Sequence, residues 1–120
     1  MLADPYNSIF HHFHHTGEII VPLKGSQVEG AGKLRMPGVI DFKYIDDVVQ
    51  VGDDEAFSMC HTLARTEGLM VGGSAGLNVH AALKVAEAAP EGSTVVTVLC
   101  DLGVKYLSTV FREASESNYA

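Results

Sequence analysis

The residues that could do chemistry gather around glycine-rich turns. One turn, GGSAG at 72–76, follows the short apolar run 69–71 and precedes a helical pattern. Its spacing matches the G-x-S-x-G motif in which serine is a hydrolase nucleophile, here Ser74. That reaction also needs a histidine later in the chain, and His80, the only one, falls on the polar stripe of the next helix. The sequence therefore disfavours a serine hydrolase.

Two further groups are candidates because of their positions. Residues 100–103 follow the β-branched run 94–99, which predicts a central parallel strand, and ligands of α/β sheets bind at the carboxyl ends of strands. The loop between Leu23 and Arg35 is rich in glycine, but it lacks the third glycine and the strand-to-helix context of a dinucleotide-binding fingerprint. This loop is either a functional segment or a flexible connector.

Four histidines lie between positions 11 and 15, and on a helix His11 could share a face with His14 or His15. Imidazole binds zinc, copper and nickel. No carboxylate or thiolate lies at ligand spacing nearby, and a solvated polar face explains the run equally well. We therefore assign no metal site.

The composition limits the class of protein. The chain has 120 residues, 47% of them hydrophobic, and a formal charge of −7, so we expect one domain, or part of one, over residues 1–120 that binds no nucleic acid. No apolar run approaches the roughly 20 residues of a membrane helix, and no export signal is present. Cys60 and Cys100 form no C-x-x-C motif, which indicates reduced thiols and a cytoplasmic setting.

The elements that position these groups alternate between strands and helices. The patterns predict strands at 1–5, 18–22, 48–51, 69–71 and 94–99, helices at 8–16, 53–67, 77–89 and 104–111, and a polar tail at 112–120. This order is typical of an α/β fold with three layers and a mostly parallel sheet. A chain that opens on the end of a strand also suggests that a preceding part of a larger fold is missing.

Ordered motifs across nearly the whole chain resemble the C-terminal part of cystathionine β-synthase and cysteine synthase. They are DDEAF at 53–57, EGLMVGGSAG at 67–76, AALK at 81–84, VVTVLCD at 95–101, YLST at 106–109, VEGAG at 28–32 and the Asp4-Pro5 dipeptide. The resemblance implies the tryptophan-synthase-like fold and pyridoxal 5'-phosphate, which acts as an electron sink while a thiol or sulfide replaces a group on serine or O-acetylserine.

The resemblance also implies where the functional groups lie. The family's Schiff-base lysine and phosphate cup belong to the portion before the Asp-Pro dipeptide, and no lysine of this chain stands in that lysine's context, so we assign no catalytic residue. Gly30, Ala31 and Gly32 match a loop whose backbone lies close to the cofactor. Asp101 and Leu102 match a motif whose serine bonds the pyridine nitrogen. Leucine cannot make that bond, which costs about 1–3 kcal/mol if the nitrogen stays unsatisfied. Cofactor binding by this chain is therefore in doubt.

Two hypotheses follow. The chain is the C-terminal segment of a β-replacement enzyme of cysteine or cystathionine metabolism, inactive by itself. Alternatively, it is a non-catalytic binding or regulatory module that pairs with a full-length homologue or with a separate N-terminal half. The resemblance implies an amino-acid substrate for the complete enzyme and either a homodimer or the pairing with an N-terminal half.

Overall fold

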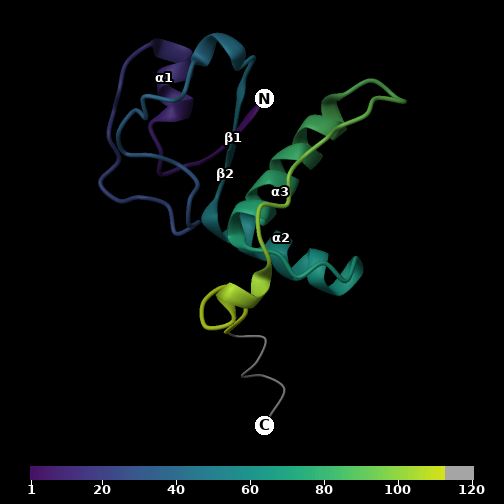
Figure 1. The fold of residues 1–120 in the computed structure, drawn as a ribbon. Coiled ribbons are helices and arrows are strands. Elements are labelled where there is room, and N and C mark those ends of the chain that lie inside the picture. Colours follow the sequence, from purple (N-terminus) through teal and green to yellow (C-terminus); the bar gives the residue numbers. More distant parts are fainter. Residues whose placement is uncertain (113–120) are drawn as a thin grey trace.

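Short parallel strands and longer helices form the regular part of the chain (Figure 1). The computed structural model describes residues 1–112. Its helices and strands are β1 (Leu2–Pro5), α1 (Phe10–Thr16), β2 (Val48–Val51), α2 (Asp53–Thr66) and α3 (Gly73–Ala88), with 3-10 turns at Phe42–Tyr44 and Gly103–Tyr106.

The strands β1 and β2 pair in parallel, with Leu2 opposite Val48 and Pro5 opposite Val51. Helix α1 contacts β2, and α3 contacts both strands. In Figure 1, α1 lies to the left of the strand pair and α3 to its right. The predicted α/β class with a parallel sheet is therefore confirmed.

Helix α2 begins at residue 53, the first position of the predicted helix. Gly52 is the N-cap, and Asp53 is the first helical residue. The side chain of Glu55 accepts a hydrogen bond from the Gly52 N–H at 2.7 Å. Asp53, Asp54 and Glu55 place negative charge in the first turn, where the helix dipole favours it.

Helices α2 and α3 cross closely at Gly76. A Cβ at this position would meet the backbone oxygen of Ala56 and would lie 2.6 Å from the sulfur of Cys60. Two buried clusters continue this contact, one with Val28, Val51, Ala56, Leu77 and Ala81, the other with Cys60, Leu63, Val71, Ala75 and Phe111. The absence of a side chain at Gly76 is what lets the two helices share a core.

Helix α3 begins four residues earlier than the prediction, which placed residues 72–76 in a turn. The carbonyl of Gly72 accepts hydrogen bonds from the N–H groups of Ala75 and Gly76, so the glycine-rich segment forms the first turn of the helix. Packing against α2 overrides the low helix propensity of glycine here.

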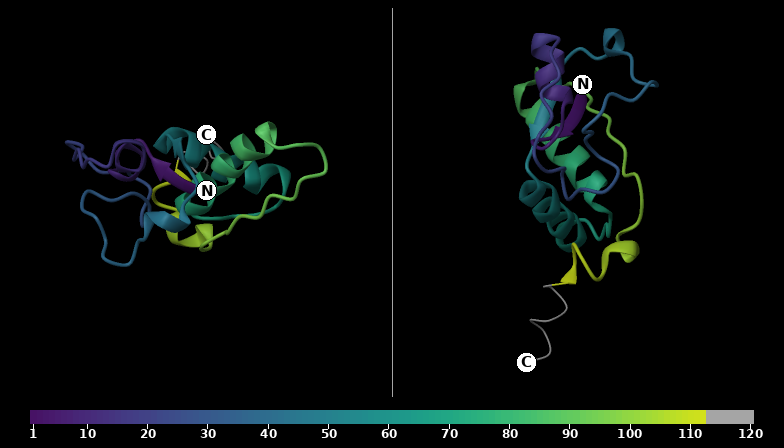
Figure 2. Two further views of the ribbon diagram at one scale, coloured as in Figure 1. Left: turned by 90° about the horizontal axis from the view of Figure 1, so that it is seen from above. Right: turned by 90° about the vertical axis from the view of Figure 1, so that its left-hand side faces the viewer.

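The strand predictions for 18–22, 69–71 and 94–99 are wrong. Residues 18–22 form no ladder, Val71 forms only an isolated antiparallel bridge with Leu102, and residues 94–99 are extended without strand partners in the described chain. Figure 2 shows the extended segment that follows α3, which contains residues 94–99, running alongside α3 in both views. A strand needs a neighbouring backbone, and a β-branched sequence alone does not supply one.

The last predicted helix is also shorter than expected. Residues 104–111 contain a 3-10 turn and further turns, with Phe111 buried against the α2–α3 core. Of the predicted polar tail, only Arg112 is described; residues 113–120 lie outside the described range. Within residues 1–112, no helix has the length and apolar character needed to cross a membrane.

Candidate functional site

The N-terminus of α3 meets the segment after residue 99, although neither 69–71 nor 94–99 forms a strand in the described chain. The Gly72 N–H donates to the Asp101 carbonyl at 3.1 Å, and the Gly103 N–H donates to the Met70 carbonyl at 2.9 Å. A Cβ at Gly72 would collide with the Asp101 carboxylate and the Tyr106 ring. Backbone hydrogen bonds thus hold the segments 70–72 and 101–106 against each other.

The Asp101 carboxylate is held from one side. The Tyr106 hydroxyl donates to Oδ2 at 2.8 Å, and the Lys105 ammonium lies 3.5 Å from the same oxygen. This hydrogen bond raises the pKa of Tyr106, because losing its proton would place a second negative charge beside Asp101. The other oxygen, Oδ1, is buried and has no hydrogen-bond partner among the described residues.

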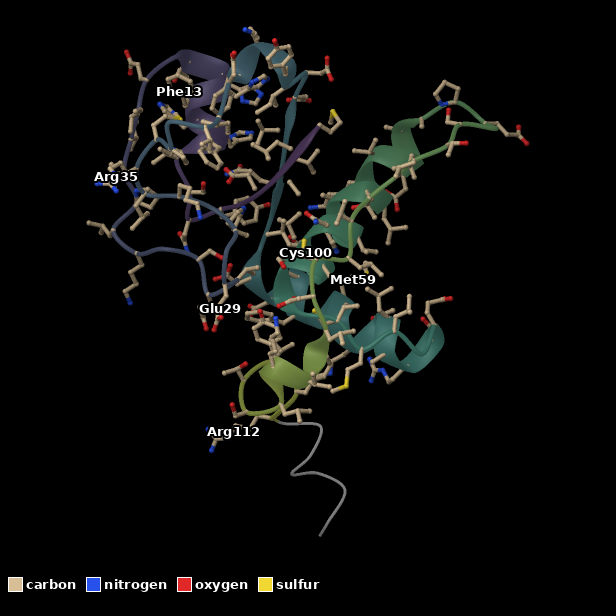
Figure 3. The ribbon with its side chains drawn as sticks, viewed as in Figure 1. Phe13, Glu29, Arg35, Met59, Cys100 and Arg112 are labelled. Carbon is tan, nitrogen blue, oxygen red and sulfur yellow. The ribbon has the colours of Figure 1, made fainter. Side chains whose placement is uncertain are left out.

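A cavity of about 590 Å³ lies beside the start of α3 and Tyr106. The residues that line it come from the glycine-rich loop, both long helices and the segment after the 3-10 turn, and they include Gln27, Glu29, Phe57, His61, Gly73 and Tyr106. Figure 3 shows Glu29 on the loop side, facing the segment that ends at Arg112. Both polar and aromatic groups are therefore available to a ligand at the start of α3.

The glycine-rich loop is attached to α2 by side-chain hydrogen bonds. The Asp53 carboxylate accepts from the Ser26 hydroxyl at 2.5 Å and from the Gln27 N–H at 2.8 Å, and the Val28 N–H donates to the Ser26 hydroxyl at 3.0 Å. Val28 is 1% exposed and belongs to the core. Of the two interpretations of this loop, the flexible connector is the poorer one at residues 26–28.

The structure does not bring all the sequence-predicted site residues into one cavity. Asp101 and Leu102 line a second cavity of about 560 Å³, whereas Gly30, Ala31 and Gly32 line neither of the two. Gly32 has a φ of +65°, and a Cβ there would meet the Pro5 ring and Ser8, so packing within the chain already requires glycine. Leu102 is 65% exposed. The cofactor roles of these residues stay predictions.

Gln27, Glu29 and Tyr106 received no role from the sequence. The signals were present, because Glu29 lies within the VEGAG motif and Tyr106 opens the YLST motif. Neither motif shows by itself that the two segments face a common cavity. That proximity follows from the Asp53 hydrogen bonds and from the Asp101–Tyr106 contact.

The histidine run contacts two carboxylates: the His11 backbone N–H donates to Asp4 Oδ2 at 3.0 Å, and two imidazoles lie near Asp47. The Nε2 atoms of His14 and His15 lie 3.9 and 3.7 Å from Asp47 Oδ1, and the His11 carbonyl is 2.8 Å from His15 Nδ1. Among the described residues, no group of three or more histidine, cysteine or acidic side chains could hold a metal ion.

The described residues do not fit pyridoxal phosphate by themselves. Ammonium groups lie near internal acceptors in four lysines: Lys33 near the Gly30 carbonyl, Lys43 near Asp41, Lys84 near Glu55 and the Gln50 carbonyl, and Lys105 near Asp101. No lysine lines either of the two cavities described above. The chain therefore presents neither a lysine for covalent attachment at these cavities nor a polar side chain at position 102.

Comparison with known proteins gives a consistent result. A family model described as "Pyridoxal-phosphate dependent enzyme" matches residues 2–101. Cysteine synthase 1 of Neurospora crassa is 36% identical over an alignment of 113 residues, which covers 92% of this chain and 30% of that protein. O-ureido-L-serine synthase of Streptomyces lavendulae is 42% identical over 83 residues, 69% of this chain and 26% of that protein.

A solved structure shows the same arrangement. The O-acetylserine-dependent cystathionine β-synthase of Helicobacter pylori superposes with a TM-score of 0.76 at 35% identity, covering 88% of this chain and 32% of that one. This chain thus spans about a third of the length of the relatives it matches. Those shares do not say which third, so the expected C-terminal placement stays a prediction.

Proposed function

Since this chain belongs to the pyridoxal-phosphate-dependent enzyme family, we propose that it is a segment of a β-replacement enzyme of cysteine metabolism and does not catalyse the reaction alone. The match over residues 2–101 carries this proposal, and the cysteine synthases among its relatives support the substrate class. The cofactor of the family supplies the electron sink for this chemistry when it is bound. In the proposal, the donor is serine or O-acetylserine and the acceptor is sulfide or a thiol.

The lysine contacts support the second half of the proposal. The ammonium groups of Lys84 and Lys105 lie beside carboxylates at 3.6 and 3.5 Å, and neither residue lines the cavity at the start of α3. What the chain contributes is a wall, made of the N-terminus of α3, Gln27 and Glu29 of the glycine-rich loop, and Tyr106, which is hydrogen-bonded to Asp101. A second polypeptide, or a further part of the same one, provides the lysine.

Cysteine formation from O-acetylserine and sulfide tests the proposal. The samples are this chain, the larger part of the Neurospora crassa enzyme outside its 113 matched residues, and their mixture, each with pyridoxal phosphate. We expect product only from the mixture. Product from this chain alone, or none from a mixture in which binding is shown, contradicts the proposed function.

Position 102 offers a variant with a defined expectation. If Leu102 occupies the place that the resemblance assigns to a serine, then Leu102→Ser should increase the affinity of the mixture for pyridoxal phosphate, by up to about tenfold for one restored hydrogen bond. Leu102→Thr tests whether another hydroxyl serves, and Leu102→Ala is the control that removes the leucine without adding a donor.

The non-catalytic module is the second candidate, and the exposed apolar surface favours it. Val96, Val98 and Leu107 are 86%, 64% and 55% exposed, which suits a chain that pairs with a homologue or with a second copy of itself. Size-exclusion chromatography with light scattering separates the possibilities. A monomer at high concentration that does not bind the relative's remaining part contradicts this candidate.

We also propose a cytoplasmic location, since Cys60 and Cys100 are both free thiols, as is usual in a reducing compartment. Cell fractionation with an antibody against the chain checks it.

A further inference from the structure

A groove separates β1 from the extended segment 94–98. These two segments form its walls, and Ala81, Ala82 and Val85 of α3 contribute small apolar side chains to it. Its volume is about 490 Å³. Figure 1 shows β2 and the extended segment 94–98 both running downward. A strand placed between β1 and residues 94–98 could therefore pair with both in a parallel sheet.

The walls of this groove carry backbone N–H and C=O groups that make no hydrogen bond to a neighbouring strand in the described chain. In the described chain, β1 bonds only β2, so one of its edges is free. Residues 94–100 make no backbone–backbone hydrogen bond with any described residue; the Val98 carbonyl accepts only side-chain hydrogen bonds from described residues, from Asn78 at 2.9 Å and from the Cys100 thiol at 3.8 Å. Free N–H and C=O groups on an extended segment are a template for another strand.

The side chains of residues 94–99 alternate as those of a strand do. Val96 and Val98 are 86% and 64% exposed, whereas Val95 and Leu99 are 39% and 41% exposed. Successive side chains of a strand point to opposite faces. The segment already has the sequence and the alternation of a sheet strand and lacks only neighbours.

We propose that one extended strand of a second polypeptide inserts between β1 and residues 94–98, over α3, and completes a sheet. The partner is the remaining part of a family chain, and the proposal rests on the proposed function in that respect. Its inserted segment has about five residues, with apolar side chains toward α3 and backbone groups free on both edges. The insertion joins the two walls through backbone hydrogen bonds, the mode known as β-augmentation.

The comparison with the longer relatives favours this occupant over a second copy. The Helicobacter pylori enzyme has the same arrangement over 88% of this chain, yet the match accounts for only 32% of that enzyme. The rest of such a chain must cover surfaces that are exposed here. A second copy would have to offer residues 94–99, which form one wall of its own groove, or the exposed run 19–21, which ends at Pro22.

Hydrogen exchange measured by mass spectrometry tests the insertion. The probe is the larger part of Neurospora crassa cysteine synthase 1 outside the 113 matched residues. We expect amides 94–99 to exchange rapidly in this chain alone and about tenfold or more slowly in the mixture, since they gain strand partners. The Glu91–Ser93 turn serves as an internal reference, because it lies outside the groove and should not change.

Proline substitutions locate the contact. Val96→Pro and Thr97→Pro each remove one N–H, and because neighbouring N–H groups of a strand point to opposite edges, one of the two variants must affect the groove side. Neither should unfold the chain alone, since these residues make no backbone hydrogen bond there. We expect at least one variant to bind the probe about tenfold or more weakly, whereas Glu91→Pro, a proline in the turn outside the groove, binds as the parent chain does.

Several results would overturn the insertion: no binding of the probe, binding without protection of 94–99, or variants at 96 and 97 that both bind as tightly as Glu91→Pro. Protection of 94–99 that rises with the concentration of this chain alone would make a second copy the occupant and would equally overturn it. Protection by the probe in a mixture that forms no cysteine would leave the insertion standing and refute the proposed function.

Discussion

Replacing Gly76 with alanine adds one methyl group at the closest contact between α2 and α3. The new Cβ would lie 2.6 Å from the Cys60 sulfur and even closer to the Ala56 carbonyl oxygen, which belongs to the backbone and cannot turn away. Both Ala56 and Cys60 are fully buried. The two helices must therefore move apart to accept the variant.

Two opposing effects determine how much Gly76→Ala changes the free energy of unfolding. Alanine is about 1 kcal/mol better than glycine inside a helix, whereas overpacking a close-packed core costs about 1–3 kcal/mol. The contact with a backbone atom places Gly76→Ala toward the upper part of that range. We expect a net loss of about 1–2 kcal/mol in the free energy of unfolding.

Urea unfolding followed by far-ultraviolet circular dichroism measures this loss. Ala86→Gly is the matched control, because Ala86 lies exposed in the same helix and should lose about 1 kcal/mol through helix propensity alone. A Gly76→Ala variant that is more stable than the parent chain would refute the close crossing of the two helices.

Three further predictions follow from the side-chain contacts. Asp53→Ala removes the acceptor that holds residues 26–28, so protease cleavage in the loop should become about tenfold faster while α2 stays helical. Burial raises the pKa of Asp4, so the ionised carboxylate destabilises the fold above that raised pKa. Asp4→Asn should therefore raise the urea midpoint at neutral pH. The difference in midpoint between the variant and the parent chain should vanish below pH 3.8, where the carboxyl group is protonated in both the folded and the unfolded chain. Burial also raises the pKa of the Cys60 thiol, so a thiol reagent should modify Cys100 rapidly in the native chain and Cys60 only after unfolding.

The local patterns of the sequence predicted most of the helical structure. The predicted helices at 8–16 and 53–67 correspond to α1 and α2, and the residues that α2 buries, Ala56, Cys60 and Leu63, follow helical spacing. These features depend on neighbours three or four residues away, which the sequence displays directly. The start of α3 at Gly73 was missed because its cause is the contact with α2, a tertiary interaction.

The candidate site was only partly predictable. Residues 100–103 were a candidate only because they follow an apolar run, and the sequence did not show that the Gly72–Asp101 hydrogen bond brings them to the start of α3. The strand predicted at 94–99 fails for a different reason, because its ladder depends on backbone that this chain does not place beside it. The roles of Glu29 and Tyr106 needed the three-dimensional arrangement of segments that lie far apart in sequence.

Covalent attachment of pyridoxal phosphate tests most directly the claim that this chain contributes a wall without the reactive lysine. The purified chain is incubated with the cofactor, reduced with borohydride, and analysed by peptide mass mapping. We predict only substoichiometric modification, distributed over exposed lysines. One equivalent of adduct at a single lysine of this chain would contradict the account.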